Sequence, residues 1–188
     1  MTRVRPGRPD DAPSLARVYA PYVADGIVSF EAEPPDAAEM ARRMAAGGDL
    51  HPWLVAEEAG TVLGYAYAGP FRARAAYAWA VETTIYLARD AQGRGVGRTL
   101  YAALLDLLTR QGFTQAAGVV ALPNDASVRL HERLGFEAAG VNRAVGWKRG
   151  RWIDVGVWQR ALAAPADPPA PPLPVSAVLG TPGARAAT

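Results

Sequence analysis

A glycine-rich segment in the middle of the chain carries the clearest chemical signal. Residues 92–97 read Gln-Gly-Arg-Gly-Val-Gly, between a strand-like run at 81–87 and a helix-like run at 98–111. Glycines let the main chain approach an anion closely, and the unpaired amides and positive dipole at a helix start attract negative charge. This spacing predicts a pyrophosphate site at the start of the helix.

Two common phosphate-binding motifs do not fit this segment. A P-loop needs lysine followed by serine or threonine after its last glycine, but Arg98 and Thr99 follow Gly97. A dinucleotide fold places its glycine loop after the first strand, with an acidic residue about 20 positions on. Here the loop lies mid-chain, and Ala117 occupies that position. A glycine-rich turn that binds no ligand is the alternative.

The composition limits the possible functions. At 188 residues with 50% hydrophobic content, the chain is long enough for one buried core and about one domain. The net charge of +2 and the interleaved arginines and glutamates argue against a nucleic-acid partner. The absence of cysteine excludes disulfides, thiolate metal sites and a cysteine acyl-enzyme, and we expect no metal.

The chain has no pattern typical of a membrane protein. No apolar run approaches the roughly 18 residues that a membrane span requires. The charged start at residues 1–6 is not followed by an apolar stretch, as a signal peptide would be. We therefore expect a soluble, cytoplasmic protein.

Hydrophobic periodicity and turn signals predict a mixed α/β single domain with the element order βααβββαβαββ. The expected strands cover residues 2–5, 53–57, 62–68, 81–87, 116–122, 139–148 and 152–160. The expected helices are one capped by Asp10-Asp11, one at 36–46, one at 98–111 and one capped by Asn124-Asp125 that ends at Gly135. Turns at Ala59-Gly60 and Arg149-Gly150 should close two hairpins.

From residue 163 onward the composition shifts to proline and alanine with almost no charge. Such a sequence cannot build a core, so we expect residues 163–188 to form an extended, largely disordered tail with polyproline II stretches. The alternative is that residues 168–174 lie across a neighbouring subunit. The folded domain is then expected at residues 1–162.

The element order and the Gln-x-x-Gly-x-Gly spacing resemble the GCN5-related N-acetyltransferase superfamily, whose loop amides bind the pyrophosphate of coenzyme A. Local sequences at 69–77, 81–86, 122–125, 131–136 and 154–159 are similar to the phosphinothricin N-acetyltransferases. The related methionine sulfoximine acetyltransferases share much of this pattern. The resemblance spans about residues 2–162 and implies acetyl-CoA as co-substrate, a small amino-acid substrate and a homodimer.

The resemblance also implies a set of cofactor-binding residues. The backbone of the strand before the loop should pair with the pantetheine arm like an added strand, and an amide there could polarise the thioester carbonyl. Asn124 should cap its helix and contact the same arm. The expected acetyl-CoA site comprises Ile85, Tyr86, Leu87, Gln92, Gly93, Arg94, Gly95, Val96, Gly97, Arg98 and Asn124.

Two residues are candidates for catalysis. A free amino acid is mostly protonated at neutral pH, so a base must take a proton before its nitrogen attacks a thioester. The resemblance implies that Glu82 is that base, although strand glutamates usually face solvent. His131 lies where many acetyltransferases of the superfamily carry tyrosine, and it could protonate the departing sulfur or help move the substrate proton. A packed or solvated bystander is the alternative for His131.

The acceptor pocket is expected to be cationic. Arg72 and Arg74 share a face of an extended segment, with Tyr77 nearby, and two guanidinium groups suit a small dianion. A solvated basic loop is the alternative. Phe30 and Tyr86 resemble family residues that line this pocket, although either could belong to the core.

The resulting hypothesis is an acetyl-CoA-dependent N-acetyltransferase. It would acetylate the α-amino group of a phosphinothricin-like or methionine sulfoximine-like amino acid by direct attack in a ternary complex. The rival hypotheses are an acetyltransferase for another amine and a catalytically silent CoA-binding module. Polyamines fit poorly with a pocket that contains Arg72 and Arg74, because cation would meet cation.

Overall fold

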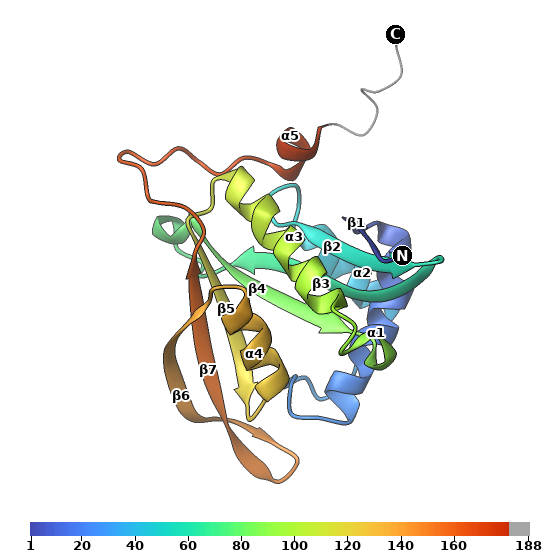
Figure 1. Cartoon of the computed structure of the whole chain (residues 1–188). Coiled ribbons are helices and arrows are strands. Elements are labelled where there is room, and N and C mark those ends of the chain that lie inside the picture. Colours follow the sequence, from blue (N-terminus) through green and yellow to red (C-terminus); the bar gives the residue numbers. More distant parts are fainter. Residues whose placement is uncertain (181–188) are drawn as a thin grey trace.

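The computed structural model describes residues 1–180, which form one seven-stranded sheet with helices on both faces (Figure 1). The strands are β1 (Arg3–Pro6), β2 (Trp53–Glu58), β3 (Thr61–Pro70), β4 (Ala80–Leu87), β5 (Gln115–Leu122), β6 (Glu137–Lys148) and β7 (Arg151–Ala161). The helices are α1 (Ala12–Ala24), α2 (Ala37–Ala46), α3 (Val96–Gln111), α4 (Asp125–Arg133) and α5 (Val175–Leu179). The predicted α/β fold class and element order are confirmed up to β7.

The sheet order is β1-β2-β3-β4-β5-β7-β6, and β4 with β5 is the one parallel pair among the described strands. A parallel pair needs a crossover connection, which α3 provides. The two hairpin turns are confirmed, since Ala59, Gly60, Arg149 and Gly150 all have positive φ, as a tight turn between twisted strands requires.

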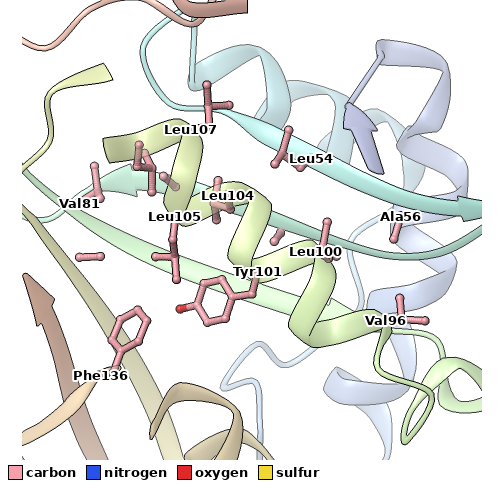
Figure 2. Packing of buried hydrophobic residues seen from close by; sticks show 14 of the residues in the cluster. Leu54, Ala56, Val81, Val96, Leu100, Tyr101, Leu104, Leu105, Leu107 and Phe136 are labelled. Atoms are coloured by element: carbon pink, nitrogen blue, oxygen red, sulfur yellow. The ribbon is translucent and has the colours of Figure 1, made fainter. Parts of the chain in front are cut away.

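Two apolar clusters cover the two faces of the sheet. One contains α3 and the inward side chains of the central strands, and Figure 2 shows its residues from Val96 to Leu107 lying over the sheet, with Phe136 close to Tyr101. The second packs α1 and α2 against Val55 and Tyr65 on the other face. Directly paired residues of neighbouring strands point to the same face of the sheet. The cluster that contains the apolar neighbours of a polar strand residue therefore shows on which face that residue lies.

Asp11 does not cap α1 as the sequence indicated. Its backbone occupies the cap position, but its carboxylate accepts two hydrogen bonds of 2.7 Å from Arg5 and one from the Arg8 amide. The guanidinium of Arg5 lowers the pKa of Asp11. The aspartate therefore ties β1 to the start of α1 by a bidentate ion pair.

The start of α3 also differs from the expected position. The helix begins at Val96 instead of residue 98, with Gly95 in the left-handed conformation as its N-cap. Val96 and Gly97 are buried, so they form part of the packed first turn. The glycine loop therefore runs directly into the helix without an intervening residue.

The first part of the tail, residues 163–174, has no helix or strand. Residues 175–179 form α5, and Val175 and Val178 pack against the α3 side of the core. The Leu173 amide donates to the Gln111 carbonyl at 2.7 Å, and the side chain of Gln111 donates back to the Leu173 carbonyl at 2.8 Å. The proline-rich stretch thus crosses its own subunit (Figure 1). Residues 181–188 lie outside the described part of the chain.

Candidate active site

The first turn of α3 presents unpaired backbone amides. The first helical hydrogen bond runs from the Thr99 amide to the Gly95 carbonyl, so the three amides before Thr99 have no partner within the helix. Gly95 has no side chain that could cap them. This end of the helix therefore presents the kind of unpaired amides on which anions bind in proteins.

The three glycines of the loop have different structural roles. Gly93 and Gly95 adopt φ values of 72° and 80°, which side chains rarely tolerate. Gly97 has ordinary helical geometry, but a Cβ there would lie 3.1 Å from Leu87. Two glycines thus shape the loop, and the third allows α3 to pack closely on β4.

The polar residues of the loop are tied to neighbouring elements. Gln92 donates to the hydroxyl of Tyr22 on α1 at 3.0 Å, and Arg94 forms an ion pair with Glu58 at 2.6 Å. Arg98 is exposed on the first turn of α3. Gln92 and Arg94 therefore fix the loop in place from two sides, which the sequence did not indicate.

A gap opens in the sheet along the second half of β4, the half that leads into this loop. β4 and β5 pair only over their first halves, from Ala80 opposite Gln115 to Thr83 opposite Gly118. Beyond Thr83 the two strands separate, and a cavity of about 50 Å³ lies between them and the start of α4. Strand edges that are unpaired on one side can accept an extended chain as an added strand.

Some of the cofactor residues expected on β4 and α4 border this gap, and one does not. Ile85, Tyr86 and Asn124 line the cavity. Asn124 also caps α4 as predicted, since its side chain accepts a hydrogen bond from the Ser127 amide at 3.2 Å. The backbone of Leu87 is instead occupied by the Tyr22 hydroxyl, which donates to its carbonyl at 2.6 Å. Only part of the expected backbone surface therefore borders the gap.

Glu82 lies half-buried on the α1 side of the sheet. It pairs with Gly69 of β3, two positions from the Tyr67 and Thr84 pair, and so it shares a face with Tyr67. Among residues 1–180 its carboxylate makes no hydrogen bond or ion pair. Burial raises the pKa of Glu82, and the positive charge of Arg72 lowers it by a smaller amount. A carboxylate in such surroundings holds a proton more readily than an exposed one.

The expected cationic pocket is only partly assembled. Arg72 lies near enough to act on Glu82, and its guanidinium stacks 4.3 Å above the Phe71 ring. Arg74 and Tyr77 are exposed on the following short turn, where the Tyr77 ring contacts Phe71 edge-on. The structure thus brings one of the two arginines towards the candidate base.

Of the two aromatic residues expected at the acceptor pocket, Tyr86 lines the cavity and Phe30 does not. The ring of Phe30 lies over Gly146 of β6, where a Cβ would come within 2.3 Å of it. Val28, from the same loop, lines the cavity instead. The ring of Tyr86 also contacts those of Tyr19 and Tyr22, so it is core and cavity wall at once.

His131 is buried on the opposite face of the sheet from Glu82, with 4% of its surface exposed. Its Nε2 lies 3.0 Å from the Tyr101 hydroxyl, and its Nδ1 lies 2.8 Å from the Ser127 carbonyl. A carbonyl only accepts, so Nδ1 carries the proton and Nε2 accepts from Tyr101. Burial lowers the pKa of His131, which favours this neutral form.

Tyr101 and Thr83 complete a polar chain that the sequence analysis missed. The Tyr101 hydroxyl lies 2.7 Å from Thr83 Oγ1, which in turn lies 3.1 Å from the Ala117 carbonyl. The three side chains come from β4, α3 and α4, and all are buried. The only indication in the sequence is that each of these polar residues lies on an otherwise apolar face of its strand or helix. That pattern does not show which of the three side chains contact one another.

The described residues were also compared with the requirements of a metal site and of a membrane-spanning helix. Within residues 1–180, no group of three or more histidine, aspartate or glutamate side chains is placed to hold a metal ion. Within the same range, no helix has the length and apolar character to cross a bilayer.

Residues 4–157 match the acetyltransferase (GNAT) domain family. The chain therefore belongs to the GNAT acetyltransferases, and the resemblance that its sequence motifs indicated is confirmed. The bare helix start and the split between two parallel strands are the parts of the fold on which its candidate site is built.

Individual proteins of this family are similar to the chain over most of its length. The phosphinothricin N-acetyltransferase of Streptomyces viridochromogenes is 45% identical over 175 residues, which cover 93% of this chain and 95% of the relative. The L-methionine sulfoximine/L-methionine sulfone acetyltransferase of Pseudomonas paraeruginosa is 35% identical over 81% of this chain and 90% of its own length. A crystal structure of a phosphinothricin acetyltransferase from Sinorhizobium meliloti with acetyl-CoA superposes with a TM-score of 0.84. It is 37% identical, and the match covers 93% and 98% of the two chains.

Proposed function

We propose that the protein transfers an acetyl group from acetyl-CoA to the α-amino group of a phosphinothricin-like or methionine sulfoximine-like amino acid. The observation that carries this proposal is the cavity between β4 and β5, because Ile85, which lines it, also lies near Gly97 in the first turn of α3. A pyrophosphate at the helix start would direct an extended pantetheine arm into this gap. Relatives that act on these amino acids and a neighbour crystallised with acetyl-CoA support the same assignment.

The charge of the acceptor side supports an anionic amino acid. Glu82 lies on the face of the sheet opposite α3, and Arg72 lies near enough to lower its pKa, so the substrate would approach the thioester from that side. Arg72 can bind a carboxylate or phosphinate oxygen, while Glu82 faces the ammonium group. We propose that Arg74 and Tyr77 join Arg72 when the substrate binds.

In the proposed reaction Glu82 removes one proton from the substrate ammonium. The neutral nitrogen then attacks the thioester carbon, the new C–N bond forms, and the C–S bond breaks as the electron pair leaves with the CoA sulfur. The nitrogen loses its second proton to the departing thiolate, so the products are the amide and the free thiol of CoA. The raised pKa of Glu82 suits this step, because a base whose pKa lies closer to neutrality accepts a proton from an ammonium more readily.

We propose a secondary role for His131. Its Nδ1 proton is directed at Ser127 and its Nε2 accepts from Tyr101, so the ring has no proton free for the sulfur in this arrangement. Protonation of the departing thiolate through His131 would require the Tyr101 hydrogen bond to rearrange. The buried chain of Thr83, Tyr101 and His131 then acts mainly to hold β4, α3 and α4 around the gap.

Thiol release with a panel of amines tests the proposal. The purified protein is incubated with acetyl-CoA and, separately, phosphinothricin, methionine sulfoximine, methionine sulfone, standard amino acids and polyamines. We expect the highest kcat/KM with a phosphinic or sulfoximine amino acid. Preference for a polyamine or an unrelated amine would overturn the substrate assignment, and tight acetyl-CoA binding without transfer to any amine would identify a silent binding module.

We also propose that the protein is a cytoplasmic homodimer. Trp147 and Trp152 are 61% and 62% exposed on the β6–β7 hairpin, whereas Trp158 is buried with 7% exposed. The exposed pair packs edge to face and offers an aromatic surface at the edge of the sheet. Light scattering should give twice the subunit mass, and a single-subunit mass would contradict the dimer.

A further inference from the structure

Lys148, at the end of β6, is bonded in an unusual way for a surface lysine. Its Nζ donates hydrogen bonds to the carbonyl oxygens of Val23, Ser29 and Glu31, at 2.7, 2.7 and 2.9 Å. These three bonds use every proton of the ammonium group. The lysine is separated from its partners by more than 100 residues of sequence.

The three carbonyls belong to the end of α1 and to the loop that follows it. Val23 lies in the last turn of α1, where helix carbonyls lack partners and attract cations. Ser29 and Glu31 lie in the segment between α1 and α2, residues 25–36, which we call the pocket loop. Lys148 therefore joins the end of α1 to the middle of the pocket loop and fixes its path.

The pocket loop places three successive side chains in three different environments. Val28 lines the cavity between β4 and β5. Ser29 is buried, with its hydroxyl 2.7 Å from that of Tyr19. Phe30 packs over Gly146, two residues before Lys148 on β6. A shift of the backbone at Ser29 would therefore move a wall of the cavity.

We propose that Lys148 is a positioning residue for the acceptor side of the active site. By holding the pocket loop through backbone carbonyls, it keeps Val28 at the cavity wall and sets the room available to the amino-acid substrate. The role rests on the function proposed above, but the contact itself does not. The pocket loop is tied through Ser29 to Tyr19 on the α1 face of the sheet, which is the face that carries Glu82, and among residues 1–180 it makes no hydrogen bond with the α3 amides. Lys148 should therefore affect acceptor binding more than cofactor binding.

A lysine is well suited to this position. Its ammonium is a compact charge with three donors, and the three carbonyls converge on one nitrogen atom. The neighbouring Arg149 provides a matched comparison, because it also reaches the end of α1 but donates one hydrogen bond, to the Ala24 carbonyl at 2.9 Å. Replacing either residue by methionine removes one positive charge from the same turn.

The test compares K148M and R149M with the wild type in two measurements. Steady-state kinetics with phosphinothricin give KM and kcat, and calorimetry gives the Kd for acetyl-CoA. For K148M we expect the amino-acid KM to rise about tenfold, with kcat reduced by less than about threefold and the acetyl-CoA Kd unchanged within about twofold. R149M should stay within about twofold of the wild type in all three.

Hydrogen exchange of the pocket loop provides the second measurement, and it needs no substrate. Amides of residues 26–32 should exchange about tenfold faster in K148M than in the wild type, and at the wild-type rate in R149M. If the wild type acetylates none of the proposed amino acids, the proposed function fails, and this exchange comparison still decides the role of Lys148.

Wild-type values of both KM and loop exchange in K148M would overturn the proposal. An equal rise of KM in R149M would also overturn it, because the effect would then follow charge alone. If K148M does not fold, K148Q carries the same comparison, since its shorter amide has only two donors. We expect K148Q to raise the amino-acid KM at least about threefold, and an unchanged KM would reject the role.

Discussion

At the level of single residues, the surroundings of Glu82 distinguish it from an ordinary strand glutamate. The alternation of β4 makes a solvent-facing glutamate the simplest expectation, and the sequence alone could not separate the two possibilities. The register places Glu82 on the α1 face of the sheet, one residue before the last pair of β4 with β5. Such a register depends on pairing across strands, which a local pattern does not contain.

Replacement of Glu82 tests its role as the base. We expect Glu82→Gln to lower kcat by roughly 10²- to 10⁴-fold, because the amide is similar in size but cannot accept the substrate proton. The acetyl-CoA Kd should be unchanged, since Glu82 lies on the face opposite α3. The control is Glu137→Gln at the exposed start of β6, which should retain full activity. Near wild-type turnover in Glu82→Gln would remove the residue from the mechanism.

The pH dependence of the reaction gives a second test at this scale. Burial raises the pKa of Glu82, so activity should fall with decreasing pH through a value above the ordinary carboxyl pKa of about 4.3. The charge of Arg72 lowers that pKa, so Arg72→Gln should move the acidic limb of kcat to still higher pH. The measurement is kcat against pH at saturating substrate for both proteins. A limb that stays in place or moves to lower pH would contradict the effect of Arg72 on the pKa of Glu82.

The contacts of His131 show a limit of sequence reasoning. Its burial could be suspected from the helix pattern, but its partners Tyr101 and Thr83 come from two other elements. Gly118 also matters, because a Cβ there would lie 2.3 Å from His131 Nε2. A glycine in a buried strand is open to several interpretations until the opposing side chain is known.

At the level of elements, the glycine loop and α3 were predictable because their signals are local. Positive φ at Gly93 and Gly95 and the bare helix start follow from residue types at adjacent positions. The role of Asp11 was not predictable in this way. Its bidentate partner, Arg5, lies on β1, so the carboxylate serves tertiary structure in place of the expected helix cap.

Substitution of Gly95 tests the anion site. Alanine at φ 80° costs roughly 1–2 kcal/mol, and relief of that strain would reorient the amides of the first turn of α3. We therefore expect Gly95→Ala to weaken acetyl-CoA binding by about fivefold to thirtyfold, measured by calorimetry. Gly48→Ala, which places a side chain at positive φ away from the loop, controls for general strain. Equal Kd values for Gly95→Ala and the wild type would count against the loop assignment.

At the level of the whole molecule, the composition of the tail did not indicate its contacts with the folded domain. A proline- and alanine-rich sequence cannot form a core of its own, but it can complete one that already exists. Trp79 donates to the Ala170 carbonyl at 2.7 Å, and the buried Gln111 side chain donates to the carbonyls of Leu50 and Leu173. The acceptors are backbone atoms, so the side chains of the tail gave no indication of these contacts.

Truncation tests the contribution of the tail. A chain that ends at residue 162 loses several backbone hydrogen bonds and the packing of Val175 and Val178 on the core. We expect it to lose about 2–4 kcal/mol of unfolding free energy, which lowers Tm by roughly 5–15 °C for a domain of this size. A chain that ends at residue 180 keeps all of these contacts and should match the full-length Tm in calorimetry. Equal Tm values for all three chains would mean that the tail does not stabilise the fold.

The position of the acyl carrier relative to the sheet decides whether Glu82 can act on the substrate. A crystal structure of the protein with acetyl-CoA tests this position most directly. We expect the pyrophosphate on the amides of residues 96–98, the pantetheine arm between β4 and β5, and the thioester at the opening that faces Glu82. A carrier bound outside this gap, or a thioester shielded from Glu82 by the sheet, would contradict the account.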